Sequence, residues 1–325
     1  MTDMLYRKVG ESGLVVSVVG LGGNNFGPKL SAAETAEVIH AALDNGVNLI
    51  DTADSYWESE DYIGLALKGR RDRVVLATKF GNDLSGAVGL DWGARASRRY
   101  IRLAVERSLR RLRTDYIDLY LLHRPDGITP LEETLSALTD LVHEGKVRYI
   151  GSSKLPGWRI TESEWIARTR GLERFIAAEN HYNLLERDAE LEVIPACMEH
   201  KIGLLPFWPL ANGLLTGKYQ QGKEPPANSR LAGDFHSIDP CMFATLDRIQ
   251  TFADARGLSM LEVAIGGLLA MPCVTSVIAG ATTTAQVRQN IDAASWSPSS
   301  EDVKSLREVL MGIPSPDGEP PEHVR

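Results

Sequence analysis

The sequence contains few cysteines and no long apolar run. Its three cysteines, Cys197, Cys241 and Cys273, lie far apart and form no CxxC pair. This spacing supports neither a disulfide framework nor a zinc site, so we expect no metal and mostly buried, reduced thiols in a cytoplasmic protein. The N-terminal segment lacks the apolar core of a signal peptide. No uncharged apolar run reaches the ~20 residues that a membrane span requires.

Basic side chains are also in the minority. Lysine and arginine total 35 against 43 aspartates and glutamates, which gives a formal net charge of −8. This balance argues against nucleic acid or an anionic membrane as the main partner. The hydrophobic share of 43% and the charged share of 24% are ordinary globular values. We expect one domain over residues 1–325, with residues 312–325 as a polar, Pro-rich tail.

A GxGxxG loop at the start of a helix is missing as well, which argues against a Rossmann domain. The chain instead alternates short runs of Val, Ile and Leu with longer amphipathic segments. The eight runs cover residues 17–22, 47–51, 73–79, 116–123, 147–153, 174–180, 202–208 and 275–280. Apolar runs joined by helical crossovers predict parallel strands covered by helices, and eight such units predict a (β/α)8 TIM barrel. We expect residues 5–18 to form a β-hairpin that caps the bottom of the barrel.

The helix signals are clearest in residues 31–46. Ser31 and Glu34 have the spacing of a capping box, and apolar residues recur on one face of the segment. Residues 97–112 and 128–145 show similar patterns, so we expect helices there too. These segments supply the crossovers that a parallel barrel needs.

Four polar residues lie at or just beyond the carboxyl ends of three consecutive predicted strands. Asp51 ends the second strand, Lys79 the third and His123 the fourth, and Tyr56 follows Asp51 in the next loop. Catalytic residues of (β/α)8 barrels lie at this face. Taken singly, each residue has a structural explanation: a helix cap, a snorkelling lysine, a hydrogen-bonding histidine or a rim aromatic. Four such residues at one rim favour a shared function.

The chemistry of these four residues suits the protonation of an oxygen. Asp51 can act as the counter-charge of a buried Lys79. A cation about 4 Å from Tyr56, at an effective dielectric near 20, is worth about 4 kcal/mol at most, so we expect it to lower the tyrosine pKa by roughly two to three units. Tyr56 would then act as a general acid, assisted by a ring N–H of His123. A lyase that uses Lys79 as a Schiff-base nucleophile is disfavoured, because Asp51 would keep the amine charged.

The chain resembles the aldo-keto reductase superfamily from about residue 5 to residue 310. The motifs that carry the resemblance are DTADSY, ATKFG, DLYLLHRPD, VRYIGSS, NHYNLLER, PLANGLLTGKY and AGATTTAQVRQN. The resemblance implies a (β/α)8 barrel that reduces aldehydes or ketones with NADP(H), or with NAD(H) in some members, and that also runs as an alcohol dehydrogenase. It assigns the catalytic roles to Asp51, Tyr56, Lys79 and His123, and it implies a small-molecule carbonyl substrate.

The resemblance also implies positions that bind the cofactor, and some of them depart from the family pattern. Ser152 and Ser153 stand where the family holds the nicotinamide carboxamide with Ser-Asn, and Glu179 replaces the Gln of the same site. Phe207 matches the aromatic residue that stacks on the ring. The long connection over residues 209–240 is where the family binds the pyrophosphate. The remaining expected contacts are Leu210, Asn212, Leu214, Gly217, Lys218, Gly280, Thr282, Gln286 and Asn290.

Three further expectations concern specificity. Relatives often place Arg or Lys after the glycine of the eighth strand to hold a 2′-phosphate, whereas this chain has Ala281 and Thr282. NADP(H) is still favoured by the resemblance, and NAD(H) stays open. Trp57, where relatives often have Gly, and Trp208 are expected to line the substrate pocket.

An alternative function is a catalytically weak, nicotinamide-binding redox sensor or regulatory subunit, since some family members are channel β-subunits. The oligomeric state, monomer or homo-oligomer, is left open.

Overall fold

The computed structural model describes residues 4–226, 229–233 and 238–311, and eight parallel strands form its central sheet. The strand order is β10-β3-β4-β5-β6-β7-β8-β9. At the remaining seam, Leu204 N donates to Cys273 O over 2.8 Å and Ile278 N donates to Pro206 O over 3.0 Å, so the sheet closes on itself. The predicted barrel and its eight strands are confirmed. The strands are β3 (Val19–Gly22), β4 (Leu49–Asp51), β5 (Val75–Phe80), β6 (Ile117–Leu122), β7 (Val147–Ser153), β8 (Phe175–Glu179), β9 (Gly203–Leu204) and β10 (Val277–Gly280).

The predicted hairpin closes the amino-terminal floor of the barrel. Strands β1 (Tyr6–Lys8) and β2 (Val15–Ser17) pair antiparallel, and Val16 is buried among side chains of the barrel interior. Gly10, in the turn, has φ +55°, and a Cβ there would lie 2.4 Å from Lys201 O. Only glycine tolerates this close approach of two backbones. The hairpin therefore lies directly against the beginning of β9.

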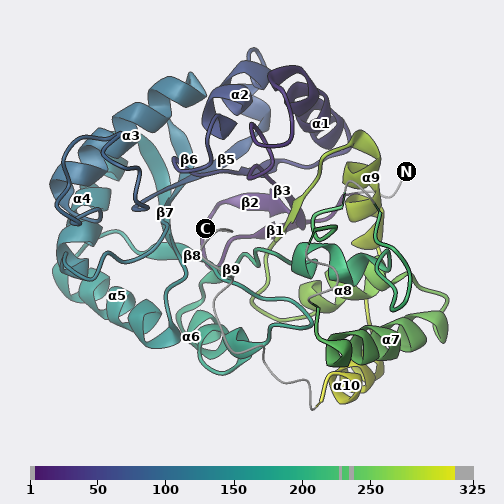
Figure 1. The fold of residues 1–325 in the computed structure, drawn as a ribbon. Coiled ribbons are helices and arrows are strands. Elements are labelled where there is room, and N and C mark those ends of the chain that lie inside the picture. The colour runs from purple at the N-terminus through teal and green to yellow at the C-terminus, as the bar shows by residue number, and fades with distance from the viewer. Residues whose placement is uncertain (1–3, 227–228, 234–237, 312–325) are drawn as a thin grey trace.

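Helices cover the outside of the barrel, as the ring of ribbons in Figure 1 shows. In α1, the Ser31 side chain accepts from Glu34 N and the Glu34 carboxylate accepts from Ser31 N, which confirms the predicted capping box. The helices expected over residues 97–112 and 128–145 are present as α3 and α4. The helices of the described residues are α1 (Ala32–Asp44), α2 (Ser59–Ala66), α3 (Arg98–Leu112), α4 (Leu131–His143), α5 (Gly157–Arg170), α6 (Val193–His200), α7 (Pro240–Asp254), α8 (Met260–Leu269), α9 (Thr284–Ala293) and α10 (Ser300–Val309).

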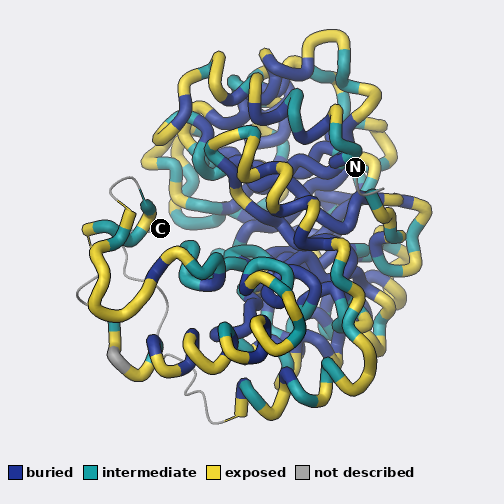
Figure 2. Tube along the Cα trace, turned by 90° about the vertical axis from the view of Figure 1, so that its right-hand side faces the viewer, coloured by how far each residue is buried: buried dark blue, intermediate teal, exposed yellow. Residues whose placement is uncertain are grey.

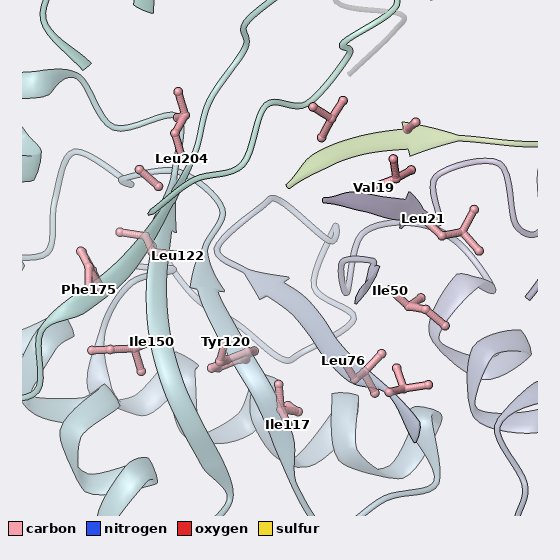
Figure 3. Packing of buried hydrophobic residues seen from close by; sticks show 14 of the residues in the cluster. Val19, Leu21, Ile50, Leu76, Ile117, Tyr120, Leu122, Ile150, Phe175 and Leu204 are labelled. Carbon is pink, nitrogen blue, oxygen red and sulfur yellow. The ribbon is translucent and has the colours of Figure 1, made fainter. Parts of the chain in front are cut away.

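Alternate residues of each strand serve two different cores, because successive strand side chains point to opposite faces. Ile50 and Tyr120 belong to the larger core between strands and helices, which Figure 3 shows from close by. Leu49 and Leu121, each one position away, belong to a smaller core inside the barrel. Figure 2 shows that buried residues fill the centre of the molecule while exposed residues follow its outer turns.

The remaining expectations concern the long connection, the tail, the cysteines, the membrane and the domain count. The connection after β9 contains the short helix η3 (Ala211–Thr216) before α7 begins, and the predicted tail over residues 312–325 lies outside the described residues. All three cysteines are free. The prediction that the thiols are mostly buried was wrong for Cys241, which is exposed. Among the described helices, none is long and apolar enough to cross a membrane. That the whole chain is one domain stays a prediction.

Candidate active site

The strand alternation explains why polar residues meet at the mouth of the barrel. Each of four polar residues comes two positions after a side chain of the inner core, so each faces the barrel axis at its carboxyl end. The pairs are Leu49 and Asp51, Ala77 and Lys79, Leu121 and His123, and Ala177 and Glu179. The structure thus brings the predicted catalytic residues together. It adds Glu179, which the sequence indicated only as a cofactor contact.

Lys79 is the centre of this group and is completely buried. Its Nζ donates to Asp51 Oδ1 and Oδ2, both over 2.6 Å, and to Thr52 O over 3.0 Å. A second carboxylate oxygen, Glu179 Oε2, lies 3.2 Å from the same nitrogen. The two carboxylates raise the pKa of Lys79 in spite of its burial. The lysine is therefore an ammonium in the resting protein, which argues against Schiff-base chemistry.

The expected acidification of Tyr56 is wrong for this structure. Lys79 Nζ lies 5.3 Å from the centre of the Tyr56 ring and does lower the phenol pKa. Burial outweighs that cation, and the charges of Asp51 and Glu179 add to the burial effect, so the pKa of Tyr56 rises to about 12. Tyr56 is consequently held as a neutral phenol, a proton donor, at physiological pH.

His123 is held in a defined state beside Tyr56. The two rings are 5.8 Å apart in an edge-on arrangement. Burial lowers the pKa of His123 well below its usual range, and the positive charge of Lys79 adds to this, so the imidazole is neutral. Asn82 Nδ2 donates to His123 Nδ1 over 3.0 Å and to Ser55 Oγ over 3.0 Å. Because Nδ1 accepts, the ring proton resides on Nε2, where it can be donated to an oxygen.

The loop that carries Tyr56 is fixed from outside the barrel by Arg111 of α3. Its Nη1 donates to Asp54 O over 3.1 Å, and its Nη2 donates to Trp57 O. The two acceptors flank Tyr56 in sequence, so one guanidinium holds both sides of the Tyr56 loop. Sequence patterns did not indicate this residue, since Arg111 lies in an Arg-rich stretch of a surface helix.

A cavity of about 1230 Å³ opens above these residues, with Asp51 and Tyr56 in its wall. Ten of the expected cofactor and substrate residues also line it: Glu179, Phe207, Trp208, Leu210, Asn212, Lys218, Gly280, Thr282, Gln286 and Asn290. Ser152, Ser153, Leu214, Gly217 and Trp57 are not among the lining residues. Trp57 is 60% exposed, so the structure does not bring it to the cavity wall, and its role stays a prediction.

The cavity has cationic and polar features that fit a dinucleotide. Lys29, Lys218 and Arg230 all line it, and the charges of the other two lower the pKa of Lys29, after burial. Three clustered cations suit a pyrophosphate or phosphate group. Arg230 and Lys29 were not expected from the sequence, because both lie in irregular loops without a local pattern. Arg288, on α9, does not line the cavity.

Buried polar atoms at the inner end of the site also fit the amide of a nicotinamide ring. Within the described residues, Ser153 Oγ, Glu179 Oε2 and Asn212 Oδ1 are buried without a hydrogen-bond partner. Ser153 lies opposite Glu179 in the β7–β8 register. Phe207 lies beyond them, stacked on His181 with ring centres 5.4 Å apart. Buried polar groups require partners, and a carboxamide supplies both donors and an acceptor.

Comparison with known proteins agrees with this geometry. The model of the Aldo/keto reductase family matches residues 18–311. The chain belongs to the aldo/keto reductase family. An uncharacterized oxidoreductase of Bacillus subtilis, YrpG, is 36% identical, over 98% of this chain and 99% of the relative. A versiconal hemiacetal acetate reductase of Aspergillus parasiticus is 33% identical, over 95% and 97%. A probable voltage-gated potassium channel subunit beta of Arabidopsis thaliana is 33% identical, over 91% and 92%.

Family membership sets the class of chemistry. Aldo/keto reductases are oxidoreductases that use a nicotinamide dinucleotide, NADH or NADPH, and the cavity described above has the residues to hold one. When bound, this cofactor supplies the hydride. The chain's own residues must then bind the carbonyl compound, orient it and protonate its oxygen.

Proposed function

We propose that this protein is a carbonyl reductase that converts aldehydes or ketones to alcohols with NADPH, with Tyr56 as the general acid. The observation that carries the proposal is the arrangement around Lys79: a buried ammonium between two carboxylates, beside a phenol that lines the cavity. An acid next to a fixed cation suits an oxygen that gains negative charge. The same residues catalyse the reverse direction, the oxidation of an alcohol.

Each residue has a distinct part in the proposed mechanism. Tyr56 O–H donates a hydrogen bond to the carbonyl oxygen and transfers its proton as the oxygen becomes anionic. His123 donates from Nε2 to the same oxygen and fixes its direction. Lys79 stabilises the phenolate that Tyr56 becomes, and Asp51 keeps Lys79 charged and in place. Arg111 and Asn82 position the Tyr56 loop and the His123 ring respectively.

NADP(H) is the cofactor that we propose, with NAD(H) as the other candidate. Support comes from the cluster of Lys29, Lys218 and Arg230, whose three cations exceed the two negative charges that a pyrophosphate carries. We also propose a cytoplasmic location, as a sequence with sparse cysteines indicates. The substrate would be a small-molecule carbonyl compound.

A second candidate function has support from the relatives. The Arabidopsis thaliana relative is described as a probable channel subunit beta, so a nicotinamide-binding regulatory subunit with weak catalysis is the alternative. The two functions differ in turnover, because a regulatory subunit would bind the dinucleotide without consuming it rapidly.

The decisive experiment compares the wild-type protein with Tyr56→Phe. Binding of NADPH and NADH is measured by fluorescence titration, followed by turnover with a panel of aldehydes and ketones. We expect both proteins to bind NADPH with similar affinity, and only the wild type to oxidise it at an appreciable rate. Binding without turnover in the wild type would support the regulatory alternative. Equal turnover by both proteins would remove Tyr56 from the proposed mechanism.

A further inference from the structure

The buried group around Lys79 contains one more negative charge than positive charge. The exposed fractions of the Lys79, Asp51 and Glu179 side chains are 0%, 4% and 3%. If both carboxylates were ionised, the three residues would carry a net charge of −1 without solvent to stabilise it. Because an uncompensated buried charge is costly, such a site takes up a proton.

Glu179 is the member of the group that holds this proton. Asp51 has both carboxylate oxygens 2.6 Å from Lys79 Nζ, whereas Glu179 has one oxygen at 3.2 Å, so Asp51 is the closer partner of the ammonium. Burial and the charge of Asp51 raise the pKa of Glu179 to about 8, although Lys79 opposes them. Burial raises the pKa of Asp51 as well, but its two closer contacts with Lys79 make Asp51 the ionised partner of the lysine and leave the proton on Glu179.

The other charged and titratable groups near Glu179 leave this assignment unchanged. Tyr56, from the loop after β4, is a neutral phenol. His181, two residues beyond Glu179, is neutral because burial lowers its pKa to about 4. Lys154, which follows β7, donates its backbone N–H to Glu179 O over 3.0 Å. Its Nζ lies above the Phe207 ring, 5.6 Å from the centre.

Glu179 also lies where the charge of the cofactor changes. A hydride donor must lie beside Tyr56, because hydride and proton reach adjacent atoms of one carbonyl group. Glu179 lines the same cavity as Tyr56, and both are tied to Lys79. The nicotinamide ring is neutral in NAD(P)H and carries a formal charge of +1 in NAD(P)⁺. A nearby carboxylate therefore stabilises the oxidised form, and a neutral carboxylic acid suits the reduced form.

We propose that Glu179 is a proton store coupled to the cofactor: it is protonated with the reduced cofactor and ionised with the oxidised cofactor. The proposal rests on the proposed reductase function and deepens it. In each reduction, the carbonyl carbon gains the hydride and the carbonyl oxygen gains the Tyr56 proton. Lys79 then gives a proton to the Tyr56 phenolate and takes the proton of Glu179. Glu179 recovers a proton from solvent when the oxidised cofactor leaves.

This coupling predicts a specific pH dependence of cofactor binding. Oxidised cofactor binds better when Glu179 is ionised, so its affinity rises with pH until the pH passes the value of about 8 found for Glu179. One linked proton allows a change of up to about tenfold per pH unit. The ratio of the oxidised to the reduced dissociation constant is the quantity to follow, since ionisation of a 2′-phosphate near pH ~6 affects both forms alike.

The test measures this ratio between about pH 6 and pH 8 for the wild type, Glu179→Gln and a control, Glu186→Gln. Glu186 is a matched control because burial raises its pKa to about 7 and it does not line the cavity. We expect the ratio to fall at least threefold (~0.6 kcal/mol) with rising pH in the wild type and in Glu186→Gln, and to stay constant in Glu179→Gln. Calorimetry in two buffers of different ionisation enthalpy should show proton release on NAD(P)⁺ binding, again only where Glu179 is present.

A spectroscopic measurement gives an independent readout. The infrared difference spectrum of apo wild type minus apo Glu179→Gln at pH 7 should show the C=O stretching band of one protonated carboxyl group, whereas the other buried carboxyl groups, Asp54, Glu60 and Glu186, cancel in the difference. A constant ratio in the wild type, or an unchanged slope in Glu179→Gln, would overturn the proton store while leaving the reductase function intact. Failure of the wild type to bind either cofactor would instead overturn the reductase function, and the proton store with it.

Discussion

Two buried clusters on opposite faces of β5 each contain two carboxyl groups, but they differ in the number of cations that accompany these groups. Lys79, facing the barrel axis, serves two carboxylates with a single cation. Thr78, the preceding residue, faces the helices and donates to Glu60 Oε1 over 2.7 Å. Behind it, Asp54 and Glu60 are buried together. Burial raises the pKa of both, and the charge of Glu60 adds to the rise for Asp54; Arg107 and Arg111 oppose these effects without cancelling them.

The difference lies in charge balance and access. The outer cluster has two arginines for two carboxylates, and neither Asp54 nor Glu60 lines the cavity. The inner cluster has one lysine for two carboxylates, and both Asp51 and Glu179 line the cavity. The enclosed outer cluster is not in contact with the cavity, so it acts on the fold and on the position of the Tyr56 loop, which Arg111 holds. An unbalanced cluster beside a cavity responds to the charge of whatever binds there.

The largest expected effect is on catalysis and comes from removing Lys79, the cation of the inner cluster. Lys79→Met should reduce kcat for carbonyl reduction by at least ~10³-fold, because the Tyr56 phenolate loses its stabilising charge. The unfolding free energy should change less than the activity, since Asp51 and Glu179 can take up protons. Steady-state kinetics and urea denaturation measure the two quantities. A variant with normal kcat would contradict the assigned role of the ammonium.

Removing an outer cation should instead reduce stability. Arg111→Met leaves Glu60 without its guanidinium partner at 3.4 Å, and breaking a buried pair typically costs ~3–5 kcal/mol. The free energy of unfolding is measured by urea denaturation. Arg110→Met, the exposed neighbour on α3, is the control and should lie within ~0.5 kcal/mol of the wild type. Equal stability of the two variants would show that the outer cluster does not stabilise the fold.

The two directions of the reaction should separate with pH. Carbonyl reduction needs the neutral Tyr56 phenol, whereas alcohol oxidation needs the phenolate as a base. Because the pKa of Tyr56 is about 12, the phenolate fraction increases with pH throughout the neutral and alkaline range. We expect kcat for oxidation to rise up to about tenfold per pH unit between about pH 7 and pH 9, while that for reduction changes little. An oxidation rate that is level above pH ~7 would indicate an acidified tyrosine.

The smallest expected effect concerns the inner cluster's neighbour, His123. Asn82→Ala removes the hydrogen bond that fixes its tautomer, and a bond of this kind is worth ~0.5–1.5 kcal/mol. We expect kcat to fall by about tenfold at most, with little change in cofactor affinity. Nitrogen chemical shifts of the labelled imidazole report the tautomer directly. Unchanged shifts in the variant would show that another contact holds the ring.

The sequence predicted the barrel because its signals are local. Strand runs, capping boxes and turn glycines each operate over a few residues, so all eight strands could be placed. The four residues proposed as catalytic could be found because Asp51, Lys79 and His123 interrupt apolar runs at strand ends and Tyr56 follows in the next loop. Arg230, Asn82 and Arg111 could not, because they lie in loops or a charged helix, where nothing local distinguishes them from surface residues.

The acidity of Tyr56 was mispredicted for a physical reason. The sequence argument counted one cation beside the phenol, and the structure does contain that cation. The sequence argument did not include the rise in the tyrosine pKa that burial causes. It also treated Glu179 as a cofactor contact rather than as a second charge beside Lys79. Effects of this kind depend on which residues of distant strands converge, which spacing within one segment does not determine.

The hairpin at the floor of the barrel affects the order in which ligands can enter and leave the site. β1 and β2 fill the amino-terminal end with apolar side chains, so a molecule that reaches Tyr56 arrives from the carboxyl ends of the strands. Substrate and dinucleotide would then enter through the same opening, and the molecule bound deeper could leave only after the other had left. If the proposed hydride donor binds below the carbonyl compound, the alcohol must leave before the oxidised dinucleotide. A closed floor would in that case give the proposed reaction a fixed order of product release.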